Sequence, residues 1–184
     1  AGCFLVLCVF MWRNITDLLD SDMASDMIYA NLLARERSFL SENWYYSTEI
    51  RIFTNHLSFA PLFLLTQDWF LVRVLGSALA YALLVLSVYA LLRAAGLRRR
   101  FPPVAAALLL PLSELYFHFT LVGTFYTYNL ILTFLLLALA LAQSAPRAPR
   151  ARAPRLAALL ALSLAAGLGG YRFLYLFSLP LAAA

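Results

Sequence analysis

The sequence contains no lysine, few acidic residues and only two cysteines. All fourteen basic residues are therefore arginine, against nine acidic residues, and charged residues make up only 12% of the chain. Soluble domains usually carry about 25% charged residues. Cys3 and Cys8 lie in one apolar run, so they predict neither a disulfide framework nor a metal pair. These shortages exclude an ordinary soluble domain and a disulfide-stabilised secreted domain.

Hydrophobic residues, by contrast, make up 64% of the sequence, and the mean hydropathy is +0.81. The usual apolar share of a globular domain is about 45–50%. The net charge of +5 does not indicate a nucleic-acid partner, because the arginines gather in two short connections between apolar runs. The composition therefore predicts an all-α, polytopic bundle of transmembrane helices surrounded by membrane lipid.

The apolar runs divide the chain into expected spans, since a crossing helix needs about 20 mostly apolar residues. Residues 1–12 predict a truncated first transmembrane helix, so we expect the chain to be the N-terminal part of a longer protein. The remaining windows in region 69–184 are 69–93, 104–122, 125–143 and 156–170. The residues after 170 predict an interfacial segment or a further membrane segment.

Two arginine-rich connections predict the orientation of these spans. One follows the 69–93 window and carries Arg98, Arg99 and Arg100, and the other is the low-complexity linker 144–155. Short arginine-rich loops stay in the cytoplasm. Two spans separate the connections, so both can lie on the same side. Residues 13–68, which hold eight of the nine acidic residues, are then expected to be extracytoplasmic.

The 13–68 loop is too long for a plain connector and predicts two interfacial helices. The first runs from about residue 22 to 37, with Met23, Met27, Ala30 and Ala34 at helical spacing. Asp20 or Ser21 can cap its N-terminus. The second, at 55–65, is apolar enough to lie along the bilayer surface.

The carboxylates in the first of these helices raise the question of chemistry. Asp22 and Asp26 are four residues apart and are expected to share one helix face. Carboxylates at this position either cap and solvate the helix, or take up a proton or a divalent cation such as Mg²⁺ or Mn²⁺. The pattern alone leaves both readings open.

The stretch "DMASDMIYANLLARERSFLSENW", residues 22–44, resembles the first outer loop of GT-C class membrane glycosyltransferases. That superfamily includes the dolichyl-phosphate-mannose–protein mannosyltransferases and bacterial enzymes that use polyprenyl-phosphate-linked sugars. Asp22 falls on the aspartate of the motif, Asp26 near its later acid and Trp44 on its tryptophan. The chain departs from the motif at Met23, where a second acid is usual, and at Asn43.

The resemblance implies a multi-pass enzyme of the bacterial plasma membrane, with its active-site loop extracytoplasmic. It implies sugar transfer from a polyprenyl-phosphate-linked donor to an extracytoplasmic acceptor. Asp22 is then the base or acceptor-orienting group with Asp20 as its partner, and the two are candidate ligands for Mg²⁺ or Mn²⁺. Arg172 is the expected ligand of the donor phosphate, against the alternative of an arginine that extends to the interface.

Further polar residues are expected near the same cavity. Glu114 and His118 are four apart, and with Asp26 they are candidate contacts to the acceptor or a metal; alternatively, Glu114 and His118 pair with each other. The tyrosines at 116, 126 and 128 indicate an interfacial aromatic belt or sugar stacking.

Two other functions compete with glycosyl transfer. A transporter or flippase for lipid-linked glycans is disfavoured, because transporters place polar groups and broken helices near the membrane midplane. The 69–93 window offers only Arg73, near one end. The other alternative is a non-catalytic scaffold whose outer loop binds a partner.

Overall fold

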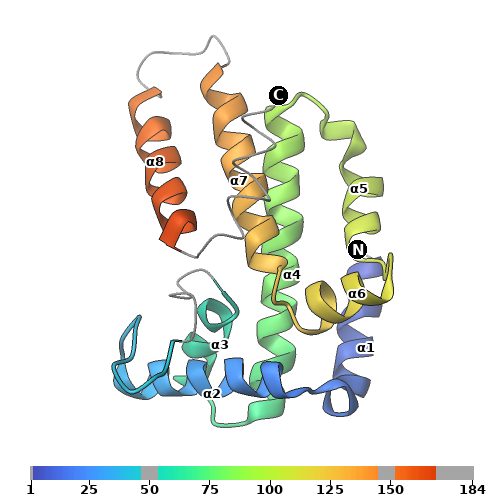
Figure 1. The fold of residues 1–184 in the computed structure, drawn as a ribbon. Coiled ribbons are helices and arrows are strands. Elements are labelled where there is room, and N and C mark those ends of the chain that lie inside the picture. Colours follow the sequence, from blue (N-terminus) through green and yellow to red (C-terminus); the bar gives the residue numbers. More distant parts are fainter. Residues whose placement is uncertain (1, 47–53, 145–151, 169–184) are drawn as a thin grey trace.

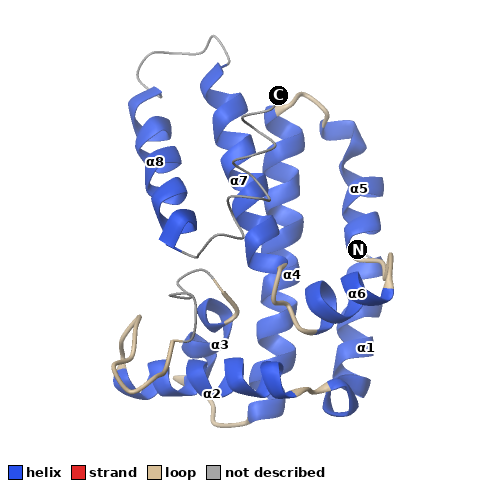
Figure 2. Cartoon of the chain, in the orientation of Figure 1, coloured by secondary structure: helices blue, strands red, loops and turns tan. Residues whose placement is uncertain are grey.

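The chain is built from helices alone wherever the structure describes it. The structure is a computed structural model that describes residues 2–46, 54–144 and 152–168, and every regular element in these ranges is helical (Figure 2). Five helices run roughly along one direction (Figure 1): α1 (Gly2–Leu18), α4 (Trp69–Ala94), α5 (Phe101–Leu108), α7 (Thr127–Ser144) and α8 (Arg152–Leu168). The others are α2 (Ser21–Glu36), α3 (His56–Phe63), η1 (Arg98–Arg100), α6 (Glu114–Tyr116) and the π-helix η2 (Phe117–Val122). The expected all-α class is confirmed.

Helix α4 is the central element of the bundle. It begins where the carboxylate of Asp68 accepts a hydrogen bond from the backbone N–H of Leu71, at 3.0 Å. Its 26 residues extend about 39 Å at 1.5 Å per residue, which exceeds the roughly 30 Å hydrocarbon core of a bilayer. Within the described ranges it is the one helix that is by itself long and apolar enough to cross a membrane, and two bent helix pairs would raise the number to three. The window 69–93 is confirmed as a helix.

The corner between α1 and α2 differs from the expected boundary. We expected the first helix to end at residue 12, but α1 continues to Leu18. Asn14 does not interrupt the helix, because its Nδ2 donates to the carbonyl of Phe10 four residues earlier, at 2.8 Å. Helix α2 then turns away at 104° and runs across the end of the bundle (Figure 1). The four apolar residues predicted for its inner face are all buried.

The window 104–122 is not one continuous helix in the structure. Helix α5 ends at Leu108, because Pro111 has no backbone N–H to donate and disfavours helical geometry in the residue before it. The chain becomes helical again after Ser113, whose hydroxyl accepts from the N–H of Tyr116 at 3.1 Å. The segment from α6 to η2 then meets α7 at 84°.

The last two predicted windows lie on helices. The window 125–143 corresponds to α7, and 156–170 corresponds to most of α8, which begins earlier, at Arg152. Ala80 and Leu84 of α4 pack with Tyr128 and Ile131 of α7. A smaller apolar cluster of Leu132, Leu136 and Ala166 joins α7 to α8.

The arginine-rich segments lie at one end of α4, and the two helices of the 13–68 loop lie at the other. In Figure 1, η1 and the start of α8 lie at the upper end, whereas α2 and α3 lie at the lower end. The arginine-bearing segments on either side of α5, α6 and α7 therefore lie at the same end, as the orientation argument requires. Which side of a membrane each end faces remains a prediction.

Close packing of α3 on α4 depends on Gly76. A Cβ atom built on Gly76 would lie 2.1 Å from Cδ1 of Phe59, a distance that no real Cβ contact tolerates. Phe59 is buried and belongs to the cluster that joins α2, α3 and α4, so its ring has little room to move. The absence of a side chain at Gly76 therefore fixes the approach of α3 to α4.

We expect Gly76→Ala to lower the free energy of unfolding by about 1–3 kcal/mol, because an added methyl overpacks the helix contact. The matched control is Gly167→Ala in α8, where a Cβ meets nothing within 4 Å. That change should be neutral or stabilising, since alanine favours a helix over glycine. Thermal unfolding of the detergent-solubilised protein measures both, and equal stability of the two variants contradicts the packing argument.

Candidate functional site

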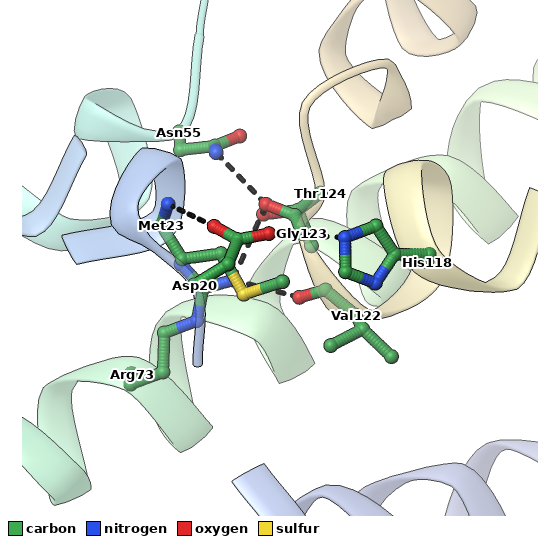
Figure 3. A network of polar contacts seen from close by, with 8 residues as sticks. All are labelled: Asp20, Met23, Asn55, Arg73, His118, Val122, Gly123 and Thr124. Carbon is green, nitrogen blue, oxygen red and sulfur yellow. Dashed lines mark hydrogen bonds and ion pairs between the residues drawn. The ribbon is translucent and has the colours of Figure 1, made fainter. Parts of the chain in front are cut away.

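The candidate site lies where α2 begins, beside η2. Asp20 is the N-cap of α2: its Oδ1 accepts a hydrogen bond from the backbone N–H of Met23 at 2.8 Å. Its Oδ2 lies 3.0 Å from Nε2 of His118, which is 98 residues further along the chain. The two oxygens of one carboxylate thus start a helix and bind an imidazole (Figure 3). We call Asp20 and His118 the carboxylate–imidazole pair.

The carboxylate–imidazole pair is accessible to solvent. The side chain of His118 is 39% exposed and that of Asp20 is 34% exposed. The edge of the imidazole packs against the ring of Phe119, with ring centroids 5.1 Å apart. When Nε2 carries the proton and donates it to Asp20, Nδ1 keeps a lone pair. Among the residues that the structure describes, Nδ1 has no hydrogen-bond partner, so it can accept a proton from a bound hydroxyl group.

His118 stands on a π-helix, which is a rare element often found at functional sites. The turn after η2 is equally unusual, because Thr124 adopts φ +58° without being glycine. Its hydroxyl donates to the carbonyl of Gly123 at 2.7 Å. Such a backbone conformation is unfavourable for residues with a Cβ and persists only where the surroundings hold it.

A buried polar network provides those surroundings. The carbonyl of Gly123 accepts hydrogen bonds from Thr124, from Asn55 Nδ2 at 3.0 Å and from Arg73 at 3.2 Å. Arg73 also donates to the carbonyl of Val122, at 2.7 Å. The same Asn55 amide lies 2.8 Å from Oδ2 of Asp26 in α2. Side chains from the start of α3 and from α4 thus converge on one turn (Figure 3), and Asp26 of α2 is joined to it through Asn55.

Arg73 is the most unusual member of this network. It is only 2% exposed, and its guanidinium lies 5.1 Å from the ring centroid of Phe59. The sequence argument treated it as a charge near a helix end, but its side chain points into the bundle. A charged residue inside an apolar span was the signal that could have identified it, because such residues usually face protein rather than lipid. No feature of the sequence indicated that Asn55 would belong to this network.

The structure separates the carboxylates that the sequence grouped. Asp22 is exposed in the first turn of α2, whereas Asp26 is buried against Asn55, so their side chains do not share one surface. Glu114 is exposed and does not pair with His118, because Asp20 takes that position. The alternative of a Glu114–His118 pair is therefore wrong. Asp20 does cap α2, as one reading predicted.

Two further predicted features have different outcomes. Arg172 lies outside the described residues. Tyr128 is buried, and its hydroxyl is hydrogen-bonded to that of Ser58, so it belongs neither to an aromatic belt nor to a sugar-binding surface. Tyr116 donates its hydroxyl to the carbonyl of Leu108, at 2.5 Å, and so closes the break after α5.

The Mg²⁺ or Mn²⁺ site predicted at Asp20 and Asp22 stays a prediction. The two oxygens of Asp20 are hydrogen-bonded to the N–H of Met23 and to His118, and Asp22 is exposed in the first turn of α2. Over residues 2–46, 54–144 and 152–168, no group of three His, Cys, Asp or Glu side chains is placed to hold a metal ion.

Comparison of the chain with protein-family models, with curated proteins and with solved structures gives no match.

The network makes Arg73 a structural requirement of the site. We expect Arg73→Met to lower the free energy of unfolding by about 2–4 kcal/mol, because hydrogen bonds from a charged group to two buried carbonyls are lost. Arg73→Lys should recover only part of this, since both hydrogen bonds come from the terminal nitrogen Nη2, whose position the shorter lysine side chain does not reproduce. The control is Arg93→Met at the exposed end of the same helix, which should change stability little. Equal effects at both positions would contradict a specific role for Arg73.

Proposed function

We propose that this chain is the membrane-embedded catalytic part of a glycosyltransferase of the bacterial plasma membrane. It moves a sugar from a polyprenyl-phosphate-linked donor to a hydroxyl group on an extracytoplasmic acceptor. The observation that carries the proposal is the carboxylate–imidazole pair, which is accessible and lies at the end of the bundle opposite the arginine-rich η1. The resemblance of residues 22–44 to GT-C class enzymes supplies the substrate class.

The proposed reaction uses His118 as the base. Nδ1 of His118 accepts the proton of the acceptor hydroxyl while that oxygen bonds to the anomeric carbon of the sugar. The bond from this carbon to the phosphate oxygen breaks, and the polyprenyl phosphate leaves with the electron pair. Asp20 accepts the Nε2 proton in a hydrogen bond, which fixes the tautomer and stabilises the imidazolium that forms.

The remaining predicted residues take supporting roles in this scheme. Asp22 lies in the first turn of α2, two residues from Asp20, and its exposed carboxylate can accept a hydrogen bond from the acceptor. Arg172 is proposed to bind the donor phosphate, because a guanidinium matches phosphate oxygens. Asp26, which was also a candidate contact to the acceptor, instead supports the turn that follows His118.

Transport of a lipid-linked glycan is the second candidate, and one observation favours it. The chain is broken between α5 and α6, and η2 meets α7 at 84°, next to the buried charge of Arg73. Discontinuous helices with buried polar groups are typical of transporters. The sequence argument against transport rested on the shortage of polar residues in the 69–93 window, but the structure buries Arg73 of that window against the turn after η2.

Replacing the members of the pair separates the candidates. We expect His118→Gln and Asp20→Asn to lower kcat by at least about 100-fold, because general base catalysis contributes factors of this order. Asparagine still caps a helix, so Asp20→Asn should preserve α2. Sugar transfer from synthetic polyprenyl-phosphate sugars to an added acceptor is measured in membranes containing the whole protein. Asp17→Asn, an exposed change in α1, is the control and should leave kcat unchanged.

The results decide between enzyme, transporter and scaffold. Unchanged transfer in His118→Gln removes the catalytic assignment. Translocation of lipid-linked glycan in vesicles, without any transfer activity in the wild type, favours the transporter. Absence of both activities in the wild type leaves the scaffold.

The sidedness of the proposal has its own test. We expect a cysteine at position 42, made by Glu42→Cys in a Cys3→Ala, Cys8→Ala background, to react in intact cells with a membrane-impermeant thiol reagent. Glu42 is exposed beyond the C-terminal end of α2. Leu97→Cys, exposed next to η1 at the opposite end of α4, is the matched control and should react only after the cells are broken open. The reverse pattern contradicts an extracytoplasmic site.

A further inference from the structure

A groove lies between the C-terminal half of α2 and α3, away from the carboxylate–imidazole pair. Its volume is about 360 Å³, and most of its lining residues are apolar. They include Leu33, Ala34, Leu57, Ala60 and Leu64. Arg37, seventeen positions after Asp20, also lines it, and this separation corresponds to roughly 25 Å along α2. The groove is therefore a separate site from the one proposed for sugar transfer.

Arg37 holds a position that usually belongs to glycine. Its N–H bonds to the carbonyl of Ala34, and the N–H of Ser38 bonds to that of Leu33, which together form a Schellman motif. In this motif the residue after the helix adopts a left-handed backbone, and Arg37 has φ 52°. A side chain with a Cβ is disfavoured there. Arginine is thus conformationally unfavourable at this position, and the need to cap the helix does not explain why it is there.

The charge of Arg37 is also not used within the described part of the chain. Its side chain is exposed and makes neither a hydrogen bond nor an ion pair with any described residue. The neighbouring carboxylate of Glu36 accepts instead from Nδ2 of Asn43, at 2.7 Å. Arg35 already places a positive charge in the last turn of α2, where it complements the helix dipole. The Arg37 guanidinium is therefore available to a ligand.

The rim of the groove is apolar and open to the surroundings. Phe39, which lines the groove, is 82% exposed, and Leu64 and Leu65 are exposed beside it. Large exposed apolar side chains in a cluster indicate contact with a membrane or a partner. Helices α2 and α3 lie across one end of α4, where a bilayer surrounding α4 would have its interface (Figure 1). An apolar groove with one arginine at the level of the bilayer interface suits a lipid, which has an apolar chain and a polar head group.

We propose that the groove between α2 and α3 binds one hydrocarbon chain of an anionic bilayer lipid, with the lipid phosphate on the guanidinium of Arg37. The apolar lining takes the chain, and the planar fork of the guanidinium takes two phosphate oxygens. The lipid attaches α2 and the start of the following loop to the bilayer surface. This site does not depend on the proposed glycosyl transfer.

The test titrates the whole protein, in a neutral maltoside detergent, with hexadecyl phosphate and follows binding by calorimetry. Hexadecanol and inorganic phosphate are the comparison ligands, because each carries one half of the proposed chemistry. We expect hexadecyl phosphate to bind at least tenfold more tightly than hexadecanol, and inorganic phosphate not to bind measurably. Equal binding of inorganic phosphate points to a simple anion site and overturns the lipid proposal, as does the absence of binding by hexadecyl phosphate.

The variants separate a ligand-binding arginine from a structural one. Arg37→Gly should weaken binding of hexadecyl phosphate at least tenfold and, because glycine suits the left-handed position, raise Tm by about 2–4 °C. Arg37→Asn also tolerates that backbone and should weaken binding without lowering Tm. Arg35→Gln removes an equal charge outside the groove and should leave affinity within twofold. Ala60→Trp, which fills the groove, should weaken binding while Arg37 is retained.

Two outcomes overturn the assignment of Arg37. If Arg35→Gln weakens binding as much as Arg37→Gly, the lipid responds to net charge and not to this groove. If both Arg37 variants lose affinity together with a lower Tm, Arg37 is part of the fold instead of a ligand-binding group.

Discussion

The guanidinium of Arg73 determines where the second half of the chain sits on the first. A buried cation is unfavourable unless its N–H groups find acceptors. Here Nη2 donates to the carbonyls of Val122 and Gly123 at the end of η2, whereas Nε and Nη1 have no acceptor among the described residues. The carbonyl of Gly123 gains two further donors, from Asn55 and Thr124, and Asn55 in turn reaches Asp26. This turn is thereby fixed to α4, to α2 and to the start of α3 at once.

The position of His118 follows from that constraint. His118 is the second residue of the π-helical segment that Arg73 holds at its other end, so the network places the imidazole beside the N-terminus of α2. Asp20 completes the arrangement, because its carboxylate caps α2 with one oxygen and binds His118 with the other. Formation of α2 and assembly of the carboxylate–imidazole pair are therefore coupled. The inner network is buried and the outer pair is accessible, which is the division expected of a site that must be both precise and reachable.

The sequence was informative wherever structure depends on neighbours along the chain. The length and apolarity of residues 69–93 predicted α4, and the cap at Asp20 with methionines at helical spacing predicted α2. The break after α5 was not predicted, because the window 104–122 was taken as one span, whereas α5 ends at Leu108 shortly before Pro111. The pairing of Asp20 with His118 joins residues 98 apart and depends on that break, so no local pattern could predict it. Arg73 was misplaced for a related reason: its acceptors are backbone carbonyls of a remote turn, which leave no trace in residue type.

The π-helical winding of η2 has a consequence for how this chain tolerates change in length. A π-helix accommodates more residues per turn than an α-helix, and each residue of an α-helix advances the side chain by about 100°. If this segment rewound as ordinary α-helix with all its residues kept, while the turn at Gly123 stayed anchored to α4, each of the five steps back to His118 would turn about 18° further. The imidazole would then point about a quarter-turn away from α2, whereas the loss of one residue at the same time would nearly restore its direction. Register in this short stretch, more than the identity of its apolar side chains, decides whether a histidine and an aspartate from distant parts of the chain meet.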